Sequence, residues 1–377
     1  MPIDNSNNKG KFNMEDLIKV KADIICHGIL ATDVAESIYE HQNPSEMHKQ
    51  GRYFGIMIKL DNKVAVLANV LYENVDKAKY KLVGTLNNLE LADIKGNIIC
   101  KVTYIDPPKW YDKKTKTNKK TSEIFIDEGE NYLHMTYSGC DYNKCDLKCK
   151  FCGCGDRIND STAEEIAEVV GFAKDERKYH VCLGGGTYLP LKKSTENFLN
   201  IIGKIREKSK DIPIWVEMVP PTKEEIKELV EAGATSFGFN IEIYDEKLRK
   251  EICPGKSAIS IEQYIERGKF ANELLGKNKV GSTLICGIAP IETIKKGIED
   301  LTANKIHPCI LAFRPSENSE FENLEECDTK SFYDCSKYAA QKMIEEGLDI
   351  FKNEGCLLCE YCTIIHDLTR EILRRSY

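Results

Sequence analysis

Beyond about residue 129, hydrophobic positions alternate between short apolar runs and longer segments with helical spacing. The short runs predict strands at 132–139, 179–186, 212–220, 235–243, 279–288 and 307–315. Apolar residues three and four apart predict amphipathic helices at 161–174, 194–208, 222–233, 260–275 and 291–303. Repeated strand–helix units imply parallel strands joined by right-handed crossovers. We therefore expect an α/β fold with a partial (β/α)6 barrel of the TIM type, whose ligand site lies at the carboxyl ends of the strands.

The segments on either side of this barrel follow different patterns. Before it, the apolar runs 52–60, 63–72 and 97–105 are separated by polar turns, which predicts a β-rich module without a catalytic motif. After it come a helical stretch at 331–353, a cysteine-rich segment and a last helix at 363–377. The expected organisation is therefore a β-rich N-terminal module (1–128), which binds a substrate or partner or serves as a scaffold, the barrel (129–318), and a helical, cysteine-rich C-terminal extension (319–377).

Composition narrows the functional classes. The chain has 377 residues, of which 42% are hydrophobic and 30% charged, so a large globular core is expected. The net charge of −7 gives no reason to expect a protein that coats nucleic acid, and the basic run 113–120 is read as a solvated loop. The polar start of the chain lacks an apolar signal core, and no run reaches the ~18–20 apolar residues of a membrane span. We therefore expect a cytoplasmic protein that does not bind membranes.

Cysteine usage is the most informative part of the composition. The sequence contains 16 cysteines, and without an export signal disulfides explain them less well than metal or redox chemistry does. Six of them lie in the predicted strands or in other apolar segments and are read as small core residues: Cys26, Cys100, Cys182, Cys253, Cys286 and Cys309.

Three cysteines stand together directly after the first predicted barrel strand, in "CDLKCKFC". Cys145, Cys149 and Cys152 are separated by three residues and then by two, and thiolates bind iron–sulfur clusters, zinc or copper(I). Three thiolates leave one iron of a four-iron cluster without a protein ligand. The alternative is a zinc site completed by Cys140, Cys154 or a distant histidine, although zinc sites usually favour paired ligands.

This Cys-x3-Cys-x-aromatic-Cys pattern, with Phe151 as the aromatic residue, resembles the signature of the radical S-adenosylmethionine (SAM) superfamily. The resemblance covers roughly residues 130–318. It implies a [4Fe–4S] cluster held by Cys145, Cys149 and Cys152, with SAM bound at the fourth iron. Reductive cleavage of SAM would then give a 5′-deoxyadenosyl radical that abstracts a substrate hydrogen, with a flavodoxin or ferredoxin as electron donor.

Other positions resemble the SAM-binding segments of this superfamily, most closely those of biotin and lipoyl synthases. By this resemblance, Gly184, Gly185 and Gly186 line the methionine part of SAM, although Thr187 stands where a glutamate is frequent. Asn240 and Glu242 alternate onto one face of the predicted fourth strand and would meet the ribose. Lys256 would bind the SAM carboxylate, in a segment with Cys253 where lipoyl synthases have arginine. Arg314 is either a site residue or a surface ion-pair partner.

A second cysteine motif, "CLLCEYC", places Cys356, Cys359 and Cys362 near the C-terminus. It predicts an auxiliary iron–sulfur cluster, with Cys327, Cys335 or a substrate atom as a further ligand, or a zinc site with His366. A set of inert thiols is the remaining alternative.

These features predict a radical SAM enzyme that acts on a small molecule or a peptide. The likeness to biotin and lipoyl synthases makes sulfur insertion or another C–H functionalisation one expected outcome. It does not establish that outcome, because this fold hosts many reactions. Maturation of a peptide or cofactor precursor and a zinc-stabilised binding protein without chemistry are the alternatives. Tyr137, Tyr142 and Tyr188 are candidate site residues by position alone.

Overall fold

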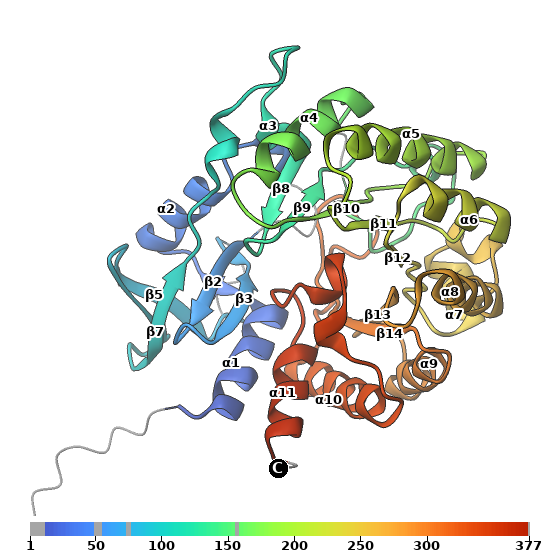
Figure 1. Ribbon diagram of the computed structural model, residues 1–377. Helices are drawn as coiled ribbons and strands as arrows, with labels where there is room; N and C mark the ends of the chain where they lie inside the picture. The colour runs from blue at the N-terminus through green and yellow to red at the C-terminus, as the bar shows by residue number, and fades with distance from the viewer. Residues whose placement is uncertain (1–11, 49–54, 73–76, 155–157, 376–377) are drawn as a thin grey trace, which may run out of the picture.

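The computed structural model describes residues 12–48, 55–72, 77–154 and 158–375. Residues 52–54 of the first predicted apolar run lie outside these ranges. In the described part, two seven-stranded sheets each have helices against them (Figure 1).

The larger unit is the predicted partial barrel. Its sheet has the order β14-β13-β12-β11-β10-β9-β8, in which the strands from β9 to β14 are all parallel neighbours. The sheet does not close on itself, because β14 and β8 remain at its two edges. The predicted fold class is therefore confirmed, with one additional antiparallel strand, β8, paired with β9. The barrel strands are β8 (Phe125–Glu128), β9 (Tyr132–Met135), β10 (His180–Leu183), β11 (Ile214–Glu217), β12 (Ser236–Gly238), β13 (Val280–Cys286) and β14 (His307–Ala312).

The helices of the barrel begin and end at sequence signals. Thr162, Thr222 and Ser260 each cap a helix through a reciprocal capping box with the residue three positions later. Gly233 ends the helix that Thr222 begins, in the left-handed conformation with φ of 117°. The helices are α4 (Ala163–Lys174), α5 (Lys192–Lys208), α6 (Lys223–Ala232), α7 (Glu246–Ile252), α8 (Ile261–Leu275) and α9 (Ile291–Ala303), and the short helices are η4 (Asp141–Lys144) and η5 (Lys256–Ala258).

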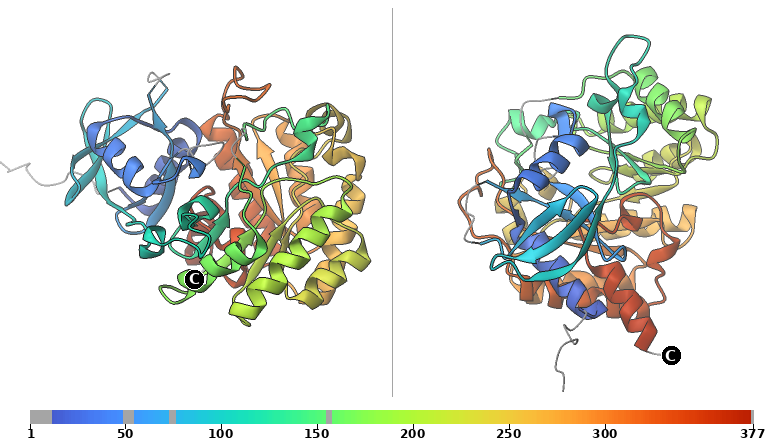
Figure 2. Two further views of the ribbon diagram at one scale, coloured as in Figure 1. Left: turned by 90° about the horizontal axis from the view of Figure 1, so that it is seen from above. Right: turned by 90° about the vertical axis from the view of Figure 1, so that its left-hand side faces the viewer.

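The N-terminal module is β-rich, but it also contains two helices that the strand-based reading did not anticipate. Its sheet has the order β3-β2-β7-β6-β5-β1-β4, and Figure 2 shows it beside the barrel. Asn13 and Asp16 form a capping box that marks the start of the first helix, a signal readable from sequence. The elements are α1 (Met14–His27), β1 (Ile29–Leu30), α2 (Asp33–Gln42), η1 (Glu46–His48), β2 (Ile56–Leu60), β3 (Val64–Ala68), β4 (Val70–Leu71), β5 (Tyr80–Thr85), β6 (Asn88–Asp93), β7 (Ile98–Tyr104), η3 (Lys109–Asp112) and α3 (Thr121–Ile124).

Helices from the two ends of the sequence lie against each other. The C-terminal extension consists of α10 (Thr329–Glu345), η6 (Ile350–Lys352), η7 (Gly355–Leu358) and α11 (Ile365–Arg375). In Figure 1, α11 lies beside both α1 and α10. The fully buried ammonium of Lys21, on α1, donates to Asp367 Oδ2 on α11 at 2.6 Å and to the carbonyl of Glu360 at 2.5 Å. A buried charge pair therefore joins the first and last helices of the described chain.

The segment around η7 fills the amino-terminal end of the barrel. The N–H of Gly355 donates to His180 Nδ1 at 3.1 Å, and His180 is the first residue of β10. A Cβ on Gly281, near the start of β13, would lie 2.4 Å from the Leu357 side chain. Trp215 and Tyr132 point into the same apolar cluster as Leu357 and Cys359. The C-terminal extension therefore supplies part of the barrel's interior, at the end opposite the carboxyl ends of the strands.

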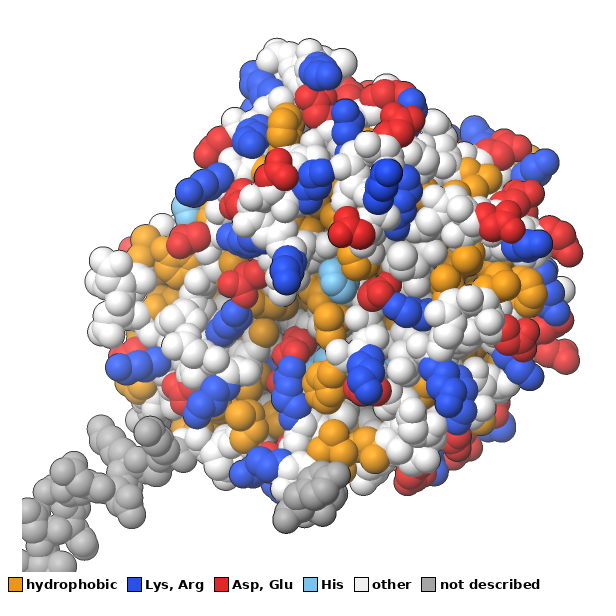
Figure 3. All heavy atoms as spheres, viewed as in Figure 1, with side chains coloured by type: hydrophobic (Ala, Val, Ile, Leu, Met, Phe, Trp, Pro, Cys, Tyr) orange, Lys and Arg blue, Asp and Glu red, His pale blue; other side chains and the backbone are white. Residues whose placement is uncertain are grey.

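The basic run 113–120 forms a turn and loop with mostly exposed side chains, as predicted. Lys119 is paired with Asp160, and the ammonium of Lys113 lies 4.7 Å from the ring centre of Phe172. Basic and acidic side chains are interspersed over the face shown in Figure 3. Within the described ranges, the helices are all too short or too polar to span a membrane.

A buried histidine should make the stability of this fold depend on pH. His48 is fully buried, its Nε2–H donates to the carbonyl of Phe125 at 3.3 Å, and burial lowers its pKa to about 4. Between pH 7 and pH 5 the unfolded chain gains a proton at this position and the folded chain does not. The unfolding free energy should therefore fall by about 2 kcal/mol more in the wild type than in His48→Asn.

Urea denaturation at both pH values would measure this difference. The matched control is His41→Asn, because His41 is exposed. Its replacement should leave the pH dependence unchanged within about 0.5 kcal/mol. Equal pH dependence of the wild type and His48→Asn would show that His48 is not held neutral by burial.

Candidate functional site

A cavity of about 260 Å³ lies at the carboxyl ends of the barrel strands. Its walls come from the segments that follow β9, β10, β11 and β12, and from η5. This is where parallel α/β folds bind ligands. The cavity is lined by His134, Tyr137, Cys140, Tyr142, Asn143, Cys149, Phe151, Cys152, Gly153, Cys154, Gly185, Gly186, Thr187, Glu217, Met218, Val219, Asn240, Glu242, Lys256 and Ser316.

The loop that carries the first cysteine motif is held by backbone contacts on two sides. The N–H of Lys150 donates to the carbonyl of Ile252 at 2.9 Å, and the N–H of Gly255 donates to the carbonyl of Leu147 at 3.2 Å. On the other side, the N–H of Phe321 donates to Lys150 O at 3.2 Å. The loop after β14 and the segment after α7 thus fix the two motif cysteines, Cys149 and Cys152, at the cavity wall.

Both of these thiols have lowered pKa values. A hydrogen bond from the Cys253 thiol lowers the pKa of Cys149 against the opposing effect of burial, and Lys256 adds to the lowering. A hydrogen bond from Cys154 lowers the pKa of Cys152 to about 6. Because thiolates are the metal-binding form of cysteine, this environment favours the state that a soft metal needs.

Cys145, the first cysteine of the motif, is placed differently. Its exposed thiol donates to the carbonyl of Asp141 at 3.2 Å, and it does not line the cavity. Arg314 is also outside the cavity, and its guanidinium lies 3.5 Å from the carbonyl of Ile25. The structure therefore brings Cys149, Cys152 and Phe151 together at the cavity, and leaves Cys145 beside it and Arg314 away from it.

The cavity contains an ion pair within electrostatic reach of Cys149. Lys256 Nζ donates to Glu242 Oε1 at 2.6 Å. Burial alone would lower the pKa of Lys256, but Glu242, Cys149 and Tyr264 together outweigh it and the pKa is raised. Lys256 therefore enters the cavity as an ammonium, and its role toward the SAM carboxylate stays a prediction.

Asn240 and Glu242 do not lie on a regular strand, contrary to the sequence-based expectation. Strand β12 ends at Gly238, and Glu242 has φ of 68°. The segment stays beside β13 through irregular hydrogen bonds, with Asn240 Oδ1 accepting from Thr283 N at 3.0 Å and Glu242 N donating to Thr283 O at 2.9 Å. Both side chains still line the cavity, but a turn rather than strand alternation places them there.

Three consecutive glycines after β10 form another wall. Gly185 and Gly186 line the cavity with φ of 108° and 138°, a region that favours glycine. A Cβ on Gly186 would lie 1.9 Å from the carbonyl oxygen of Gly139, and one on Gly184 would lie 3.1 Å from Glu217 Cβ. The turn thus brings two backbone segments close together and leaves peptide groups facing a ligand.

Gly186→Ala should damage this wall. A left-handed backbone and a clash with the Gly139 backbone together should lower the unfolding free energy by at least about 2 kcal/mol. Ligand affinity for the cavity should fall at least tenfold, measured as the SAM dissociation constant. The control is Gly203→Ala in α5, where a Cβ meets nothing within 4 Å and the change should stabilise by about 0.5–1 kcal/mol. Unchanged SAM affinity in a folded Gly186→Ala protein would contradict a ligand at this turn.

Sequence reasoning did not find several cavity residues, of which His134 and Glu217 are the ionisable ones. His134 points inward from β9, with Nδ1 3.1 Å from Glu128 Oε2, and Glu217 is the last residue of β11. Each is a polar residue within an apolar strand, which is the signal that could have identified them. Tyr137 and Tyr142 line the cavity as their position suggested, whereas Tyr188 donates to Ser138 O at 2.8 Å.

A family model described as "Radical SAM superfamily" matches residues 141–309, which contain the cysteine motif, the glycine turn and the Glu242–Lys256 pair. Residues 141–309 of this chain are a radical SAM domain. The match leaves the reaction open.

Named relatives of this radical SAM protein are distant. Bacteriochlorophyllide c C-7(1)-hydroxylase of Chlorobaculum limnaeum is 23% identical over 233 residues, which cover 55% of this chain and 58% of that one. A 5-amino-6-(D-ribitylamino)uracil–L-tyrosine 4-hydroxyphenyl transferase of Methanosarcina barkeri is 27% identical over 219 residues, 54% and 52% of the two chains. The chain thus spans little more than half the length of these curated relatives.

Among solved structures, that of methylornithine synthase (PylB) matches with a TM-score of 0.48 and 17% identity. The match covers 66% of this radical SAM protein and 71% of that chain.

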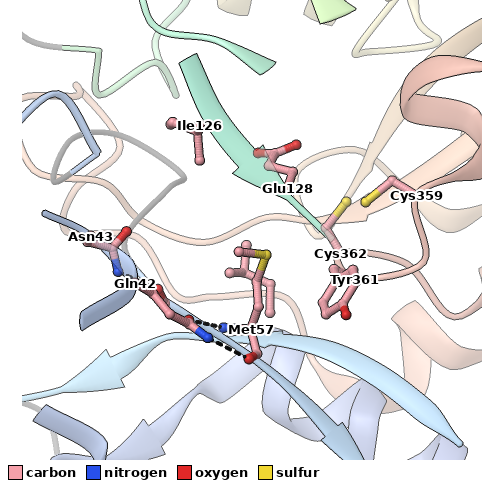
Figure 4. Close-up of a pocket in the computed structure, with 10 residues that line it drawn as sticks. Gln42, Asn43, Met57, Ile126, Glu128, Cys359, Tyr361 and Cys362 are labelled. Atoms are coloured by element: carbon pink, nitrogen blue, oxygen red, sulfur yellow. Dashed lines mark hydrogen bonds between the residues drawn. The ribbon is translucent and has the colours of Figure 1, made fainter. Parts of the chain in front are cut away.

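The second cysteine motif of this radical SAM protein lies at the other end of the barrel. Figure 4 shows the side chains of Cys359 and Cys362 next to each other, beside Glu128 and Tyr361. They line a cavity of only about 40 Å³, together with residues of α2, β2 and β8. The Cys359 thiol donates a hydrogen bond to Cys362, and this bond together with burial raises the pKa of Cys359.

The fourth ligands expected for this motif are placed elsewhere. Cys335 contacts Cys286, the last residue of β13, and Cys327 contacts both Cys286 and Cys26. The second motif contacts the first residues of the same strand, so Cys327 and Cys335 lie at the wrong end of the barrel to complete it. His366 also has another partner, since its Nε2–H donates to Leu357 O at 3.0 Å. Cys26 and Cys286 are buried, as predicted for core thiols.

Neither motif forms a closed ligand set in this structure. Across the described ranges, no three cysteine, histidine or acidic side chains are gathered in an arrangement that could hold a metal ion. The metal-binding roles of both cysteine motifs therefore stay predictions.

The donor chemistry at the first motif nevertheless fits the cluster and SAM that the family implies. Two thiols with lowered pKa values, an ammonium and a glycine turn share one cavity. At the second motif, about 40 Å³ is room for a few water molecules. That space suits a single ion better than a four-iron cluster.

Proposed function

We propose that this chain cleaves SAM reductively and uses the resulting 5′-deoxyadenosyl radical to abstract a hydrogen atom from a substrate. Cys149 and Cys152, with Cys145 rotated inward, would hold a [4Fe–4S] cluster at the cavity wall. When bound, such a cluster supplies the electron that breaks the sulfonium bond of SAM. The observation that supports this proposal most directly is that Cys149 and Cys152 share one cavity with the glycine turn and Lys256.

The other cavity residues would bind and orient SAM. The backbone of Gly184–Gly186 would lie along the methionine part, and the ammonium of Lys256 would attract its carboxylate. Asn240 and Glu242 would bind the ribose hydroxyls, because a carboxylate and an amide can accept hydrogen bonds from them. The barrel excludes water around the reacting atoms, which protects a radical from side reactions.

Anaerobic reconstitution would test the proposal. Wild-type protein supplied with iron and sulfide should bind about four irons at the first motif. After reduction it should convert SAM to methionine and 5′-deoxyadenosine, measured by chromatography. Absence of iron binding, or of SAM turnover by fully loaded protein, would refute the proposal.

The second motif has two proposed occupants, an auxiliary iron–sulfur cluster and a zinc ion. The small cavity beside Cys359 and Cys362 favours zinc. Metal analysis of Cys145→Ala/Cys149→Ala/Cys152→Ala protein would separate the two, because only the second motif remains. One zinc per chain is expected, while several irons with acid-labile sulfide would favour the cluster.

The reaction outcome and the partners are proposed from the family. The two relatives are a hydroxylase and a 4-hydroxyphenyl transferase, and both names are compatible with functionalisation of a C–H bond. Sulfur insertion would require an auxiliary cluster, which the 40 Å³ cavity does not favour. We propose a cytoplasmic enzyme that receives electrons from a flavodoxin or ferredoxin and acts on a small molecule or peptide.

A further inference from the structure

The carboxylates and the ammonium group that line the cavity do not balance. They belong to Glu217, Glu242 and Lys256. Glu242 and Lys256 neutralise each other at 2.6 Å. The structure shows no hydrogen bond or ion pair from the Glu217 carboxylate to any other residue in the described ranges. The Glu217 carboxylate is therefore left for a ligand.

The fold directs Glu217 into the cavity. Along β11, Trp215 lies in the interior cluster and Val216 belongs to the outer core, so Glu217, two residues after Trp215, faces inward again. Glu217 pairs in register with Gly238, which has no side chain to cover it, and its Cβ lies against the Gly184 turn. A half-buried carboxylate without a partner among apolar strands attracts a group of opposite charge.

A buried histidine lies deeper in the same cavity. His134 is 3% exposed, and its Nδ1 lies 3.1 Å from Glu128 Oε2. A carboxylate only accepts, so Nδ1 donates in this contact. In the register of the sheet, His134 pairs with Cys182 and Cys182 with Trp215, so His134 lies one layer below Glu217.

We propose that Glu217 binds a protonated amine of a molecule held in this cavity. This inference rests on the proposed function for the identity of the cavity, and it names the ligand class: a cationic amine rather than a carboxylate or a phosphate. The amine could belong to the second substrate or be the α-amino group of SAM. The chemistry at Glu217 is the same in both cases.

A matched pair of small probes tests the charge preference. Benzylammonium and benzoate have similar size and opposite charge, and the ring suits a cavity lined by Tyr137, Tyr142 and Phe151. Their dissociation constants would be measured anaerobically by ligand-observed NMR on the reconstituted holoenzyme, with and without S-adenosylhomocysteine. Benzylammonium should bind at least tenfold more tightly than benzoate to the wild type.

Variants assign the preference to Glu217. Glu217→Gln keeps the size and removes the charge, so the preference should vanish, whereas Glu217→Asp should retain part of it. Glu228→Gln, at an exposed position of α6, is the matched control and should behave as the wild type.

The arm with S-adenosylhomocysteine identifies the source of the amine. A preference that persists when this compound is bound assigns Glu217 to the second substrate. A preference that it abolishes, together with at least tenfold weaker binding of the compound by Glu217→Gln, assigns Glu217 to the amino group of SAM. Equal or tighter binding of benzoate by the wild type, or an undiminished preference in Glu217→Gln, would overturn the inference.

These results are separable from the proposed function. Wild-type protein that prefers benzylammonium but never cleaves SAM would leave Glu217 as an amine-binding residue and refute the radical chemistry. Efficient SAM cleavage without any charge preference would support the radical chemistry and refute the amine-binding role of Glu217.

Discussion

Replacing Cys149 by alanine is expected to abolish formation of 5′-deoxyadenosine, by a factor of at least about 10³, because one of three cluster ligands is lost. Cys149 is the motif thiol that contacts Cys253 and lies within the electrostatic reach of Lys256. Replacing Cys359 by alanine should instead spare SAM cleavage uncoupled from substrate, because Cys359 lies at the opposite end of the barrel interior. Chromatographic assay of reduced, reconstituted protein compares the two variants.

The metal content of the two variants provides the control. Cys149→Ala should lose the iron of the first motif and keep the metal of the second, and Cys359→Ala should show the reverse. Complete loss of SAM cleavage in a folded Cys359→Ala protein that retains four irons would contradict this division of roles.

The second large effect concerns stability. Lys21→Ala leaves the carboxylate of Asp367 buried, with only Arg370 Nη1 nearby at 3.5 Å. Removing one partner of a buried ion pair costs about 3–5 kcal/mol, so the midpoint of urea denaturation should fall strongly. The loss also removes the hydrogen bond to Glu360 O, which ties the segment before α11 to α1.

An exposed ion pair gives the matched control. Lys330 and Asp334 pair at 2.6 Å on the surface of α10, and Lys330→Ala should cost less than about 0.5 kcal/mol. The double variant Lys21→Met/Asp367→Leu should regain most of the stability lost in Lys21→Ala, because no unpaired charge stays buried. A change below about 1 kcal/mol in Lys21→Ala would show that this pair does not hold the two helices together.

The sequence was sufficient to predict the barrel because its signals are local. Each parallel strand is a short apolar run, and capping residues such as Thr162, Thr222 and Ser260 mark where the helices begin. The site was partly predictable for the same reason: the cysteine spacing and the glycine run are continuous in sequence. These features bring Cys149, Cys152, Gly185 and Gly186 to one cavity.

The features that could not be predicted depend on contacts between distant segments. The sequence predicted an extended strand over 235–243, and this was wrong at Asn240. The chain leaves the strand after Gly238, where a side chain of β13 binds its backbone. The role proposed for Glu217 could not be predicted, because it depends on neighbouring strands that place no partner beside its carboxylate. The location of the second motif at the amino-terminal end of the barrel is likewise a property of the tertiary fold, since nothing in "CLLCEYC" specifies which end of the strands it contacts.

The residues that complete the barrel's interior are synthesised after all of its strands. While a ribosome still holds residues 355–367, Trp215 and Tyr132 have no Leu357 beside them and the ammonium of Lys21 has no Asp367. A nascent barrel therefore lacks this part of its interior packing until translation reaches the last helix.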